Sequence, residues 1–335
     1  MFTYTLRRLL IAVPTVLMIS LVIFMLLELA PGDPMSDVPL TVPPEVKAKM
    51  REALGLDQPS WVRYLLWVKQ FLWVEPLNLV DHWFGTAYAA DMTRVTSWQT
   101  RSPVTELIAQ RLPQTLWVVG MGYCIGVSLA IPIGVISAYK QYSWFDQIGT
   151  FISMVGFSVP TFFTGVVLIV IFSVTLGWLP SIYDTTLVVN SFDSFLKQVR
   201  QMIMPITVLA LFNAAQISRF LRASMLDNLN QDYVRTARSK GMTEKVVVLL
   251  HVLRNSMIPV ITVIALGVPS IFAGAIITEQ VFKVNGLGQL LINAIQSNDL
   301  PLVQSLTFIF AVLIVFFNLI ADVLYGILDP RIRYD

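Results

Sequence analysis

Long apolar stretches separated by short polar ones dominate the sequence. The predicted membrane spans cover residues 9–30, 114–138, 148–178, 202–221, 257–282 and 302–328. A helix needs about 20 apolar residues to cross the hydrocarbon core of a bilayer. Each of these stretches meets or approaches that length. The pattern therefore predicts an all-α polytopic membrane protein with six transmembrane helices.

Composition and charge agree with a membrane protein and narrow the possible partners. Hydrophobic residues make up 56% of the 335-residue chain and charged residues 13%, whereas charged residues approach about a quarter of a soluble domain. The formal charge of +2 is too small for a nucleic-acid partner. Cys124 is the single cysteine, so the chain has neither an internal disulfide nor a cysteine-rich metal site.

The distribution of basic residues predicts the topology. With six crossings and both termini in the cytoplasm, Lys140, the basic loop at 222–258, Arg331 and Arg333 all fall on the cytoplasmic side. Cytoplasmic loops carry an excess of Lys and Arg, as this arrangement requires. The short outer loops carry only Lys197, Arg200 and Lys283.

The chain divides into three predicted regions. Residues 1–30 form an N-terminal transmembrane helix that is retained, because its apolar run is longer than that of a signal peptide and no small-x-small cleavage site follows. Residues 31–112 form an extracytoplasmic segment with short amphipathic helices. Residues 113–330 form a five-helix transmembrane core that includes the cytoplasmic loop 222–258.

Two amphipathic helices are predicted in the extracytoplasmic segment. The first begins at Pro43 and Pro44 and closes at Gly55. The second carries apolar residues on one side, rich in the aromatics that prefer the membrane interface. These residues are Trp61, Tyr64, Leu65, Val68, Phe71 and Leu72. The aromatic stretch 73–101 follows, without a predicted role.

The polar loop between the fourth and fifth spans predicts a helix, a tight turn and a second helix. The first helix covers 232–240, and Gly241 ends it because glycine can adopt the left-handed conformation. Thr243 is placed to cap a second helix over 244–255. The alternative interpretation is a solvent-exposed basic connector that only determines the membrane topology.

The amino-acid sequence of this loop resembles that of a known family. Residues 232–241 read DYVRTARSKG and residues 251–259 read HVLRNSMIP. This is similar to the EAA loop of permease subunits of binding-protein-dependent ABC importers, in the form used by the dipeptide, oligopeptide and nickel branch. Arg235 and Thr236 replace the Glu and first Ala of the general signature. The RRLL at the start of the first span, the LAPGDP at its end, the LGLDQP stretch and the C-terminal LDPRIR are also similar to that branch.

The resemblance implies the type I ABC importer permease fold in a bacterial or archaeal inner membrane. It implies a subunit that forms half of the translocation path for peptides or similar small solutes. The implied partners are a homologous second permease, two ATP-binding subunits and an extracytoplasmic solute-binding protein, within membrane lipid. ATP and Mg would be bound by the ATP-binding subunits, and this chain would bind no cofactor.

The resemblance also implies that the first helix of the loop couples this chain to an ATPase. The implied coupling residues are Tyr233, Arg235, Thr236, Ala237, Arg238, Lys240 and Gly241. In this interpretation Gly241 permits the tight turn and Ala237 permits close approach, while Tyr233 and the arginines make directional contacts.

Polar residues inside the predicted spans are further candidates, because such residues are costly within a bilayer. Asn213 and Gln216 in the fourth span, and Asn318 and Asp322 in the sixth, are candidates for lining a translocation path. Hydrogen bonding between helices is the favoured alternative for the last two. The interruptions at Pro160 and at 267–269 suit either a gate or a static kink.

Motif absences argue against an enzyme. The sequence contains no G-x-x-x-x-G-K-S/T loop for nucleotide phosphates and no H-E-x-x-H or G-x-S-x-G motif. His82 and His251 are predicted on opposite sides of the membrane, so they cannot form a metal pair. An ion-gradient-driven secondary transporter or channel remains the alternative, although it would require ionisable residues near the bilayer midplane.

Overall fold

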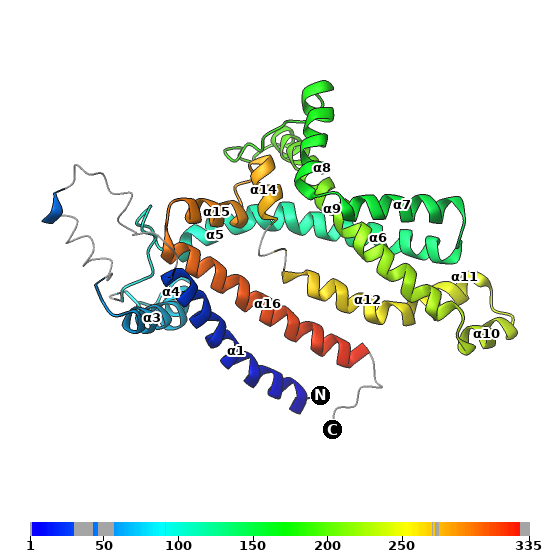
Figure 1. Cartoon of the computed structure of the whole chain (residues 1–335), viewed down its shortest axis with the longest axis horizontal. Coiled ribbons are helices and arrows are strands. Elements are labelled where there is room, and N and C mark those ends of the chain that lie inside the picture. Colours follow the sequence, from blue (N-terminus) through cyan, green and yellow to red (C-terminus); the bar gives the residue numbers. More distant parts are fainter. Residues whose placement is uncertain are drawn as a thin grey trace. The chain divides into compact units, whose positions relative to one another are not determined.

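The computed structural model describes residues 2–29, 43–45, 57–90, 92–269, 271 and 275–328. Within these ranges the chain is helical, and the only β pairing is an isolated bridge between Thr96 and Pro103. The all-α prediction is therefore confirmed for the part of the chain that the structure describes. The helices are labelled in Figure 1. Most of the LAPGDP stretch, of the helix predicted from Pro43 to Gly55 and of the C-terminal LDPRIR lies outside the described ranges.

The chain forms two compact units, which are described separately below. The first unit comprises Met1–Leu9, Pro113–Gln289 and Leu313–Asp335, and the second comprises Leu10–Leu112 and Leu290–Val312.

Among the described residues, five helices are long and apolar enough to cross a membrane. They are α1 (Phe2–Glu28), the continuous run of α5 (Val104–Thr115), η2 (Leu116–Gly120) and α6 (Met121–Tyr139), then α9 (Phe192–Leu229), the run of α11 (Glu244–Val246), η4 (Val247–Val252) and α12 (Leu253–Gly267), and α16 (Leu300–Leu328). The segments written η are π-helical turns. The count agrees with the six predicted spans if one bent helix pair is added.

That bent pair is formed by α7 (Trp144–Ser158) and by α8 (Thr161–Leu168) with η3 (Ile169–Thr175), which meet at an angle of 104°. Val159 is extended, and Pro160 occupies the position just before α8. A proline disfavours helical backbone at the residue before it, so the chain bends here. The interruption predicted at Pro160 is confirmed.

Three predicted spans have wrong boundaries. The second predicted span begins at Val104 instead of residue 114. The helix α9 has 38 residues, far more than the predicted 202–221, because Ser191 caps it well before the apolar stretch begins. The fifth span begins at Glu244 and ends at Gly267, whereas 257–282 was predicted. The polar stretch 253–256 contains no helix breaker, so helix 244–255 continues into the membrane span. Beyond Gly267, Pro269 lacks an amide hydrogen and interrupts the ladder.

After this break the chain forms two short helices, α14 (Ile276–Phe282) and α15 (Leu287–Gln296). Lys283 closes α14 in the left-handed conformation, with φ of 57°. The segment predicted as the outer end of a span is therefore a separate helix of seven residues.

The packing of α6 on α9 organises the first unit. A Cβ atom built on Gly122 or Gly126 of α6 would lie 2.8 Å from the Cβ of Leu209 or Asn213, respectively. Gly134 continues the line toward Leu221, and the intervening Ala130 is fully buried. Small residues every fourth position bring the two backbones close together.

An ion pair attaches α7 to the same long helix. Arg222 of α9 donates from Nε and from a terminal nitrogen to the two carboxylate oxygens of Asp146, at 2.6 and 2.7 Å. The Asp146 side chain is almost fully buried. Removing one partner of a buried ion pair lowers the free energy of unfolding by about 3–5 kcal/mol, because the other charge is left buried and uncompensated.

In the second unit, α3 (Ser60–Lys69) lies against the end of α1 that is distant from the N-terminus. Tyr64 shares a 2.9 Å hydrogen bond with Ser20, and Arg63 pairs with Glu28 at 3.0 Å. The residues of the predicted apolar side have different surroundings, and their place at the membrane interface stays a prediction. Tyr64 does make contact, but Trp61, Leu65 and Leu72 are exposed, and the most buried aromatic is Trp67.

The stretch 73–101, which had no predicted role, contains a turn and a helix. The π-turn η1 (Gln70–Val74) leads from α3 into α4 (Glu75–Phe84), and Gly85 closes α4 with φ of 66°. The loop that follows is fixed by Asp299, which accepts hydrogen bonds from the Ser97 hydroxyl and from the Trp98 amide. The stretch is therefore an ordered part of the second unit.

The close approach of α6 and α9 makes a testable prediction. We expect Gly126→Ala to destabilise the chain by about 1–3 kcal/mol through overpacking against Asn213 and the Ala210 backbone. Gly120→Ala on the same continuous helix is the matched control, since its new methyl would make an ordinary 3.7 Å contact with Ile271. Thermal unfolding of the two purified variants compares them, and equal midpoints would contradict the packing argument.

Candidate functional site

The polar loop after α9 has the predicted helix–turn–helix form. The helix α10 spans Asp232–Ser239, and Gly241 follows with φ of 74°. Thr243 occupies the predicted N-cap position of α11 with extended backbone, although its side chain makes no capping hydrogen bond. The predicted end at Gly241 is confirmed. Unlike the prediction, the second helix does not stop at 255.

Gly241 is needed for its backbone conformation and not for space. A Cβ atom built there would meet nothing within 4 Å. Most residues with a side chain avoid positive φ, whereas glycine adopts it readily. The tight turn between α10 and α11 therefore depends on the conformational freedom of Gly241.

One side of α10 is packed inside this chain. Val234 is fully buried and Ala237 is 6% exposed. Both belong to a hydrophobic cluster with residues of α9 and η4, namely Leu221, Met225, Val247, Val248 and Val252. Ala237 was predicted to permit the close approach of a partner ATPase, but the structure places a different neighbour beside it. The close neighbour of this small side chain is the chain's own hydrophobic cluster, because the residue is buried.

The other side of α10 is exposed and mainly basic. The exposed residues are Asp232, Arg235, Thr236, Arg238, Ser239 and Lys240. The Arg235 side chain is 75% exposed and lies 3.6 Å from Asp232, one turn away. Such exposed pairs contribute little stability, so the Arg235 guanidinium remains available to a partner.

Two interactions hold the ends of α10. Arg238 donates to both carboxylate oxygens of Glu244, at 2.8 and 3.3 Å, and so bridges the turn at Gly241. Tyr233 is half-buried and donates its hydroxyl hydrogen to the side chain of Asn228 at 2.8 Å. Tyr233 and Arg238 thus each bond to a residue outside α10, whereas the predicted coupling residues Arg235, Thr236 and Lys240 are exposed.

The four polar candidates for a translocation path have different surroundings. Asn213 donates to the Leu209 carbonyl oxygen at 2.8 Å within α9, while Gln216 is exposed. Asn318 is exposed on α16, and Asp322 pairs with Arg8 of α1 at 3.1 Å. Their role in a translocation path stays a prediction.

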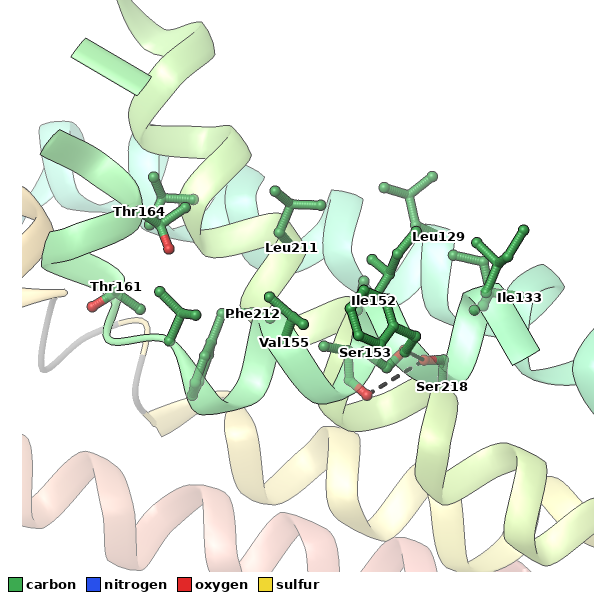
Figure 2. A pocket seen from close by; sticks show the side chains of 18 of the residues that line it. Leu129, Ile133, Ile152, Ser153, Val155, Thr161, Thr164, Leu211, Phe212 and Ser218 are labelled. Carbon is green, nitrogen blue, oxygen red and sulfur yellow. Dashed lines mark hydrogen bonds between the residues drawn. The ribbon is translucent and has the colours of Figure 1, made fainter. Parts of the chain in front are cut away.

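A cavity that the sequence pattern did not predict opens between α6, α7, α8 and α9. It has a volume of about 570 Å³, and its lining is almost entirely apolar. Figure 2 shows Leu129 and Ile133 of α6 beside Ile152 of α7 and Leu211 of α9. Ser153 and Ser218 hydrogen-bond to each other at 3.4 Å. The bend at Pro160 forms this cavity, and a sequence pattern does not show the direction of a bend.

The fold and the site define a class of protein, namely a multi-pass helical membrane protein with a short basic helix in a polar loop. The chain belongs to the family of binding-protein-dependent transport system inner membrane components. The model of that family matches residues 130–334, and the model of its N-terminal part matches residues 1–119. The predicted family is confirmed, and the chain is a multi-pass permease of the inner membrane.

Relatives match the chain over essentially its whole length. An oligopeptide transport system permease protein of Bacillus subtilis is 39% identical and covers 100% of both chains. A putative peptide transport system permease protein of Brucella abortus is 37% identical, with 98% of each chain covered. A glutathione transport system permease protein of Salmonella choleraesuis is 36% identical over 100% of both. These matches favour the permease prediction over an ion-gradient-driven carrier.

The burial of Ala237 makes a second testable prediction. We expect Ala237→Leu to destabilise the contact of α10 by about 1–3 kcal/mol, because the larger side chain overfills the cluster around Val248. Thr236→Leu adds a similar side chain at the exposed neighbouring position and should leave the contact intact. Limited trypsin digestion of the purified chain, followed at Arg238 and Lys240, measures the release of α10. Equal cleavage rates for both variants would show that α10 is not held by its buried side.

Proposed function

We propose that this chain forms half of the translocation path of a type I ABC importer for peptides or similar small solutes. The names of the full-length relatives, which carry oligopeptides, peptides or glutathione, support this substrate class. A homologous second permease supplies the other half of the path. An extracytoplasmic binding protein delivers the solute, and both termini of this chain lie in the cytoplasm.

The helix α10 docks on one of two ATP-binding subunits, which bind ATP and Mg and perform the hydrolysis. One observation carries this assignment. The helix buries Val234 and Ala237 in its own chain and exposes a basic side with Arg235, Thr236 and Lys240. A helix fixed on one side and free on the other is suited to receive a partner, and electrostatic complementarity would orient that partner.

The contacts of α10 give it a route to the membrane helices. Its buried side shares one hydrophobic cluster with Leu221 of α9 and Val260 of α12. When the ATP-binding subunits move α10, these two long helices receive the displacement through close packing. Differential binding of the subunits to two arrangements of the helices shifts the equilibrium between inward-open and outward-open states.

A substitution at the turn tests the coupling. We expect Gly241→Asp to leave membrane insertion unchanged, because nothing lies near its Cβ position and aspartate tolerates positive φ better than most residues. The new carboxylate enters a basic surface beside Lys240. We expect solute uptake to fall at least about tenfold, equivalent to about 1.4 kcal/mol of lost coupling, while ATP hydrolysis continues. Uptake and hydrolysis are measured with the whole importer in proteoliposomes.

Gly177→Asp is the matched control for this experiment. Gly177 also has positive φ, 64°, and an unobstructed Cβ position, but it follows η3 and lies far along the chain from α10. The control should transport at the parental rate. Normal uptake by Gly241→Asp, or equal losses in both variants, would remove the support for coupling at this turn.

The substrate class is tested on the cognate binding protein. We expect short peptides to raise its melting temperature, because a ligand that binds only the native state stabilises it by mass action. Nickel chelates, opines and oligosaccharides serve as the competing ligand classes. A shift with one of these classes and none with peptides would replace the substrate in this proposal and leave the permease assignment in place.

A further inference from the structure

The helix α4, in the stretch 73–101, exposes an apolar side that none of the described residues of the second unit covers. Its exposed side chains, with those of the preceding turn, are Leu72, Trp73, Leu79, Val80, Trp83 and Phe84. Trp83 and Phe84 are 76% and 75% exposed. The positions recur every three to four residues, so they form one face of a helix. An apolar face of this size on a surface helix marks a contact with a protein or a membrane.

The opposite side of α4 is fastened to its own unit by polar contacts. Glu75 is 3% exposed, pairs with Arg94 at 3.1 Å and accepts a hydrogen bond from Thr105. Asp81 accepts hydrogen bonds from the Thr86 hydroxyl and from the amides of Tyr88 and Ala89. The hydrogen bond from Thr86, with those amides, lowers the pKa of Asp81 below its ordinary value. The helix is therefore held with a charged side inward and its apolar side outward.

Contacts with α1 show the depth at which the preceding helix lies. Tyr64 of α3 bonds to Ser20, eight residues before Glu28 at the end of α1. At a rise of 1.5 Å per residue, Ser20 lies about 12 Å inside the end of that span. Since Arg63 pairs with Glu28 itself, α3 lies at the level where the span meets the membrane surface.

Contacts with α16 give the same depth independently. Trp67 and Phe71 pack edge-on against Phe308, with ring centroids 5.2 and 5.3 Å away. Phe308 is eight residues inside the start of α16 at Leu300. The segment from α3 to η1 is thus held against two membrane spans, within the thickness of one leaflet.

We propose that α4 is an interfacial helix whose apolar side lies in the phospholipid of the leaflet at the end of α1 distant from the N-terminus. Tryptophan is enriched at the boundary between headgroups and acyl chains, and amphipathic helices bury an apolar side about 5–10 Å into that boundary. The neighbouring span α1 is exposed in the same way, since only 11% of its most apolar window is buried. Lipid from the surrounding bilayer is therefore the occupant.

The proposal gives the stretch 73–101 a function beyond solute transport. Through the ion pair of Glu75 with Arg94, α4 is joined to the loop that follows it, and Asp299, just before α16, accepts a hydrogen bond from Ser97 of that loop. Lipid contact at α4 keeps this loop at a constant height above the bilayer.

Site-directed spin labelling tests the proposal in the assembled importer. Cys124 is the only cysteine of this chain, so Cys124→Ser allows a single label to be attached to the purified chain before assembly. Labels are placed at Val80→Cys and Trp83→Cys, and the control label at His82→Cys, an exposed position on the other side of α4. The importer is reconstituted in vesicles of phosphatidylethanolamine and phosphatidylglycerol. Power saturation compares collisions with oxygen and with a water-soluble nickel chelate.

We expect labels at 80 and 83 to collide severalfold more with oxygen than with the chelate, and the label at 82 to show the reverse. Two labels on the apolar face keep the test valid if one variant fails to assemble. Labels at 80 and 83 that are open to the chelate overturn the proposal. Loss of chelate access only when the binding protein is added would assign the face to a protein. Neither outcome depends on the role of α10.

Discussion

The close packing of α6 on α9 is the constraint on which the first unit depends. Glycines at 122, 126 and 134 leave no room for side chains, so the two backbones approach more closely than larger residues would permit. In a bilayer, lipid tails are as apolar as leucine, and helices associate through dispersion contacts and hydrogen bonds. A helix interface that depends on close fit loses contacts with each small displacement, and this favours one fixed arrangement of the pair.

The same helix α9 connects the membrane helices with the polar loop. It meets α7 through Arg222, and it meets α12 through Ser224, whose hydroxyl donates to the Ser256 carbonyl oxygen at 3.0 Å. One turn beyond this point it leads into α10. These three neighbours therefore contact one continuous helix of 38 residues. A force applied to the loop acts on all of them together, since a continuous helix does not absorb displacement between its ends.

Sequence patterns predicted the features that depend on local chemistry. The apolar spans, the break at Pro160 and the turn at Gly241 each follow from a few adjacent residues. The patterns failed where distant contacts decide. Hydropathy does not show that α9 continues beyond the bilayer, and a family signature does not show that Ala237 is buried by its own chain. The aromatic stretch after residue 72 had no predicted role, because its arrangement depends on distant contacts of Arg94 and Asp299.

The ion pair between Asp146 and Arg222 has a consequence for biosynthesis. The two residues are 76 positions apart, so the ribosome makes Asp146 well before its partner. Until then the carboxylate has only local partners, the amide of Tyr142 and the hydroxyl of Thr150. Placing that charge in an apolar environment without a guanidinium is costly. We expect α7 to reach its final position only after α9 has left the translocon. The helices of this part of the chain then do not take their final positions in the order in which they are synthesised.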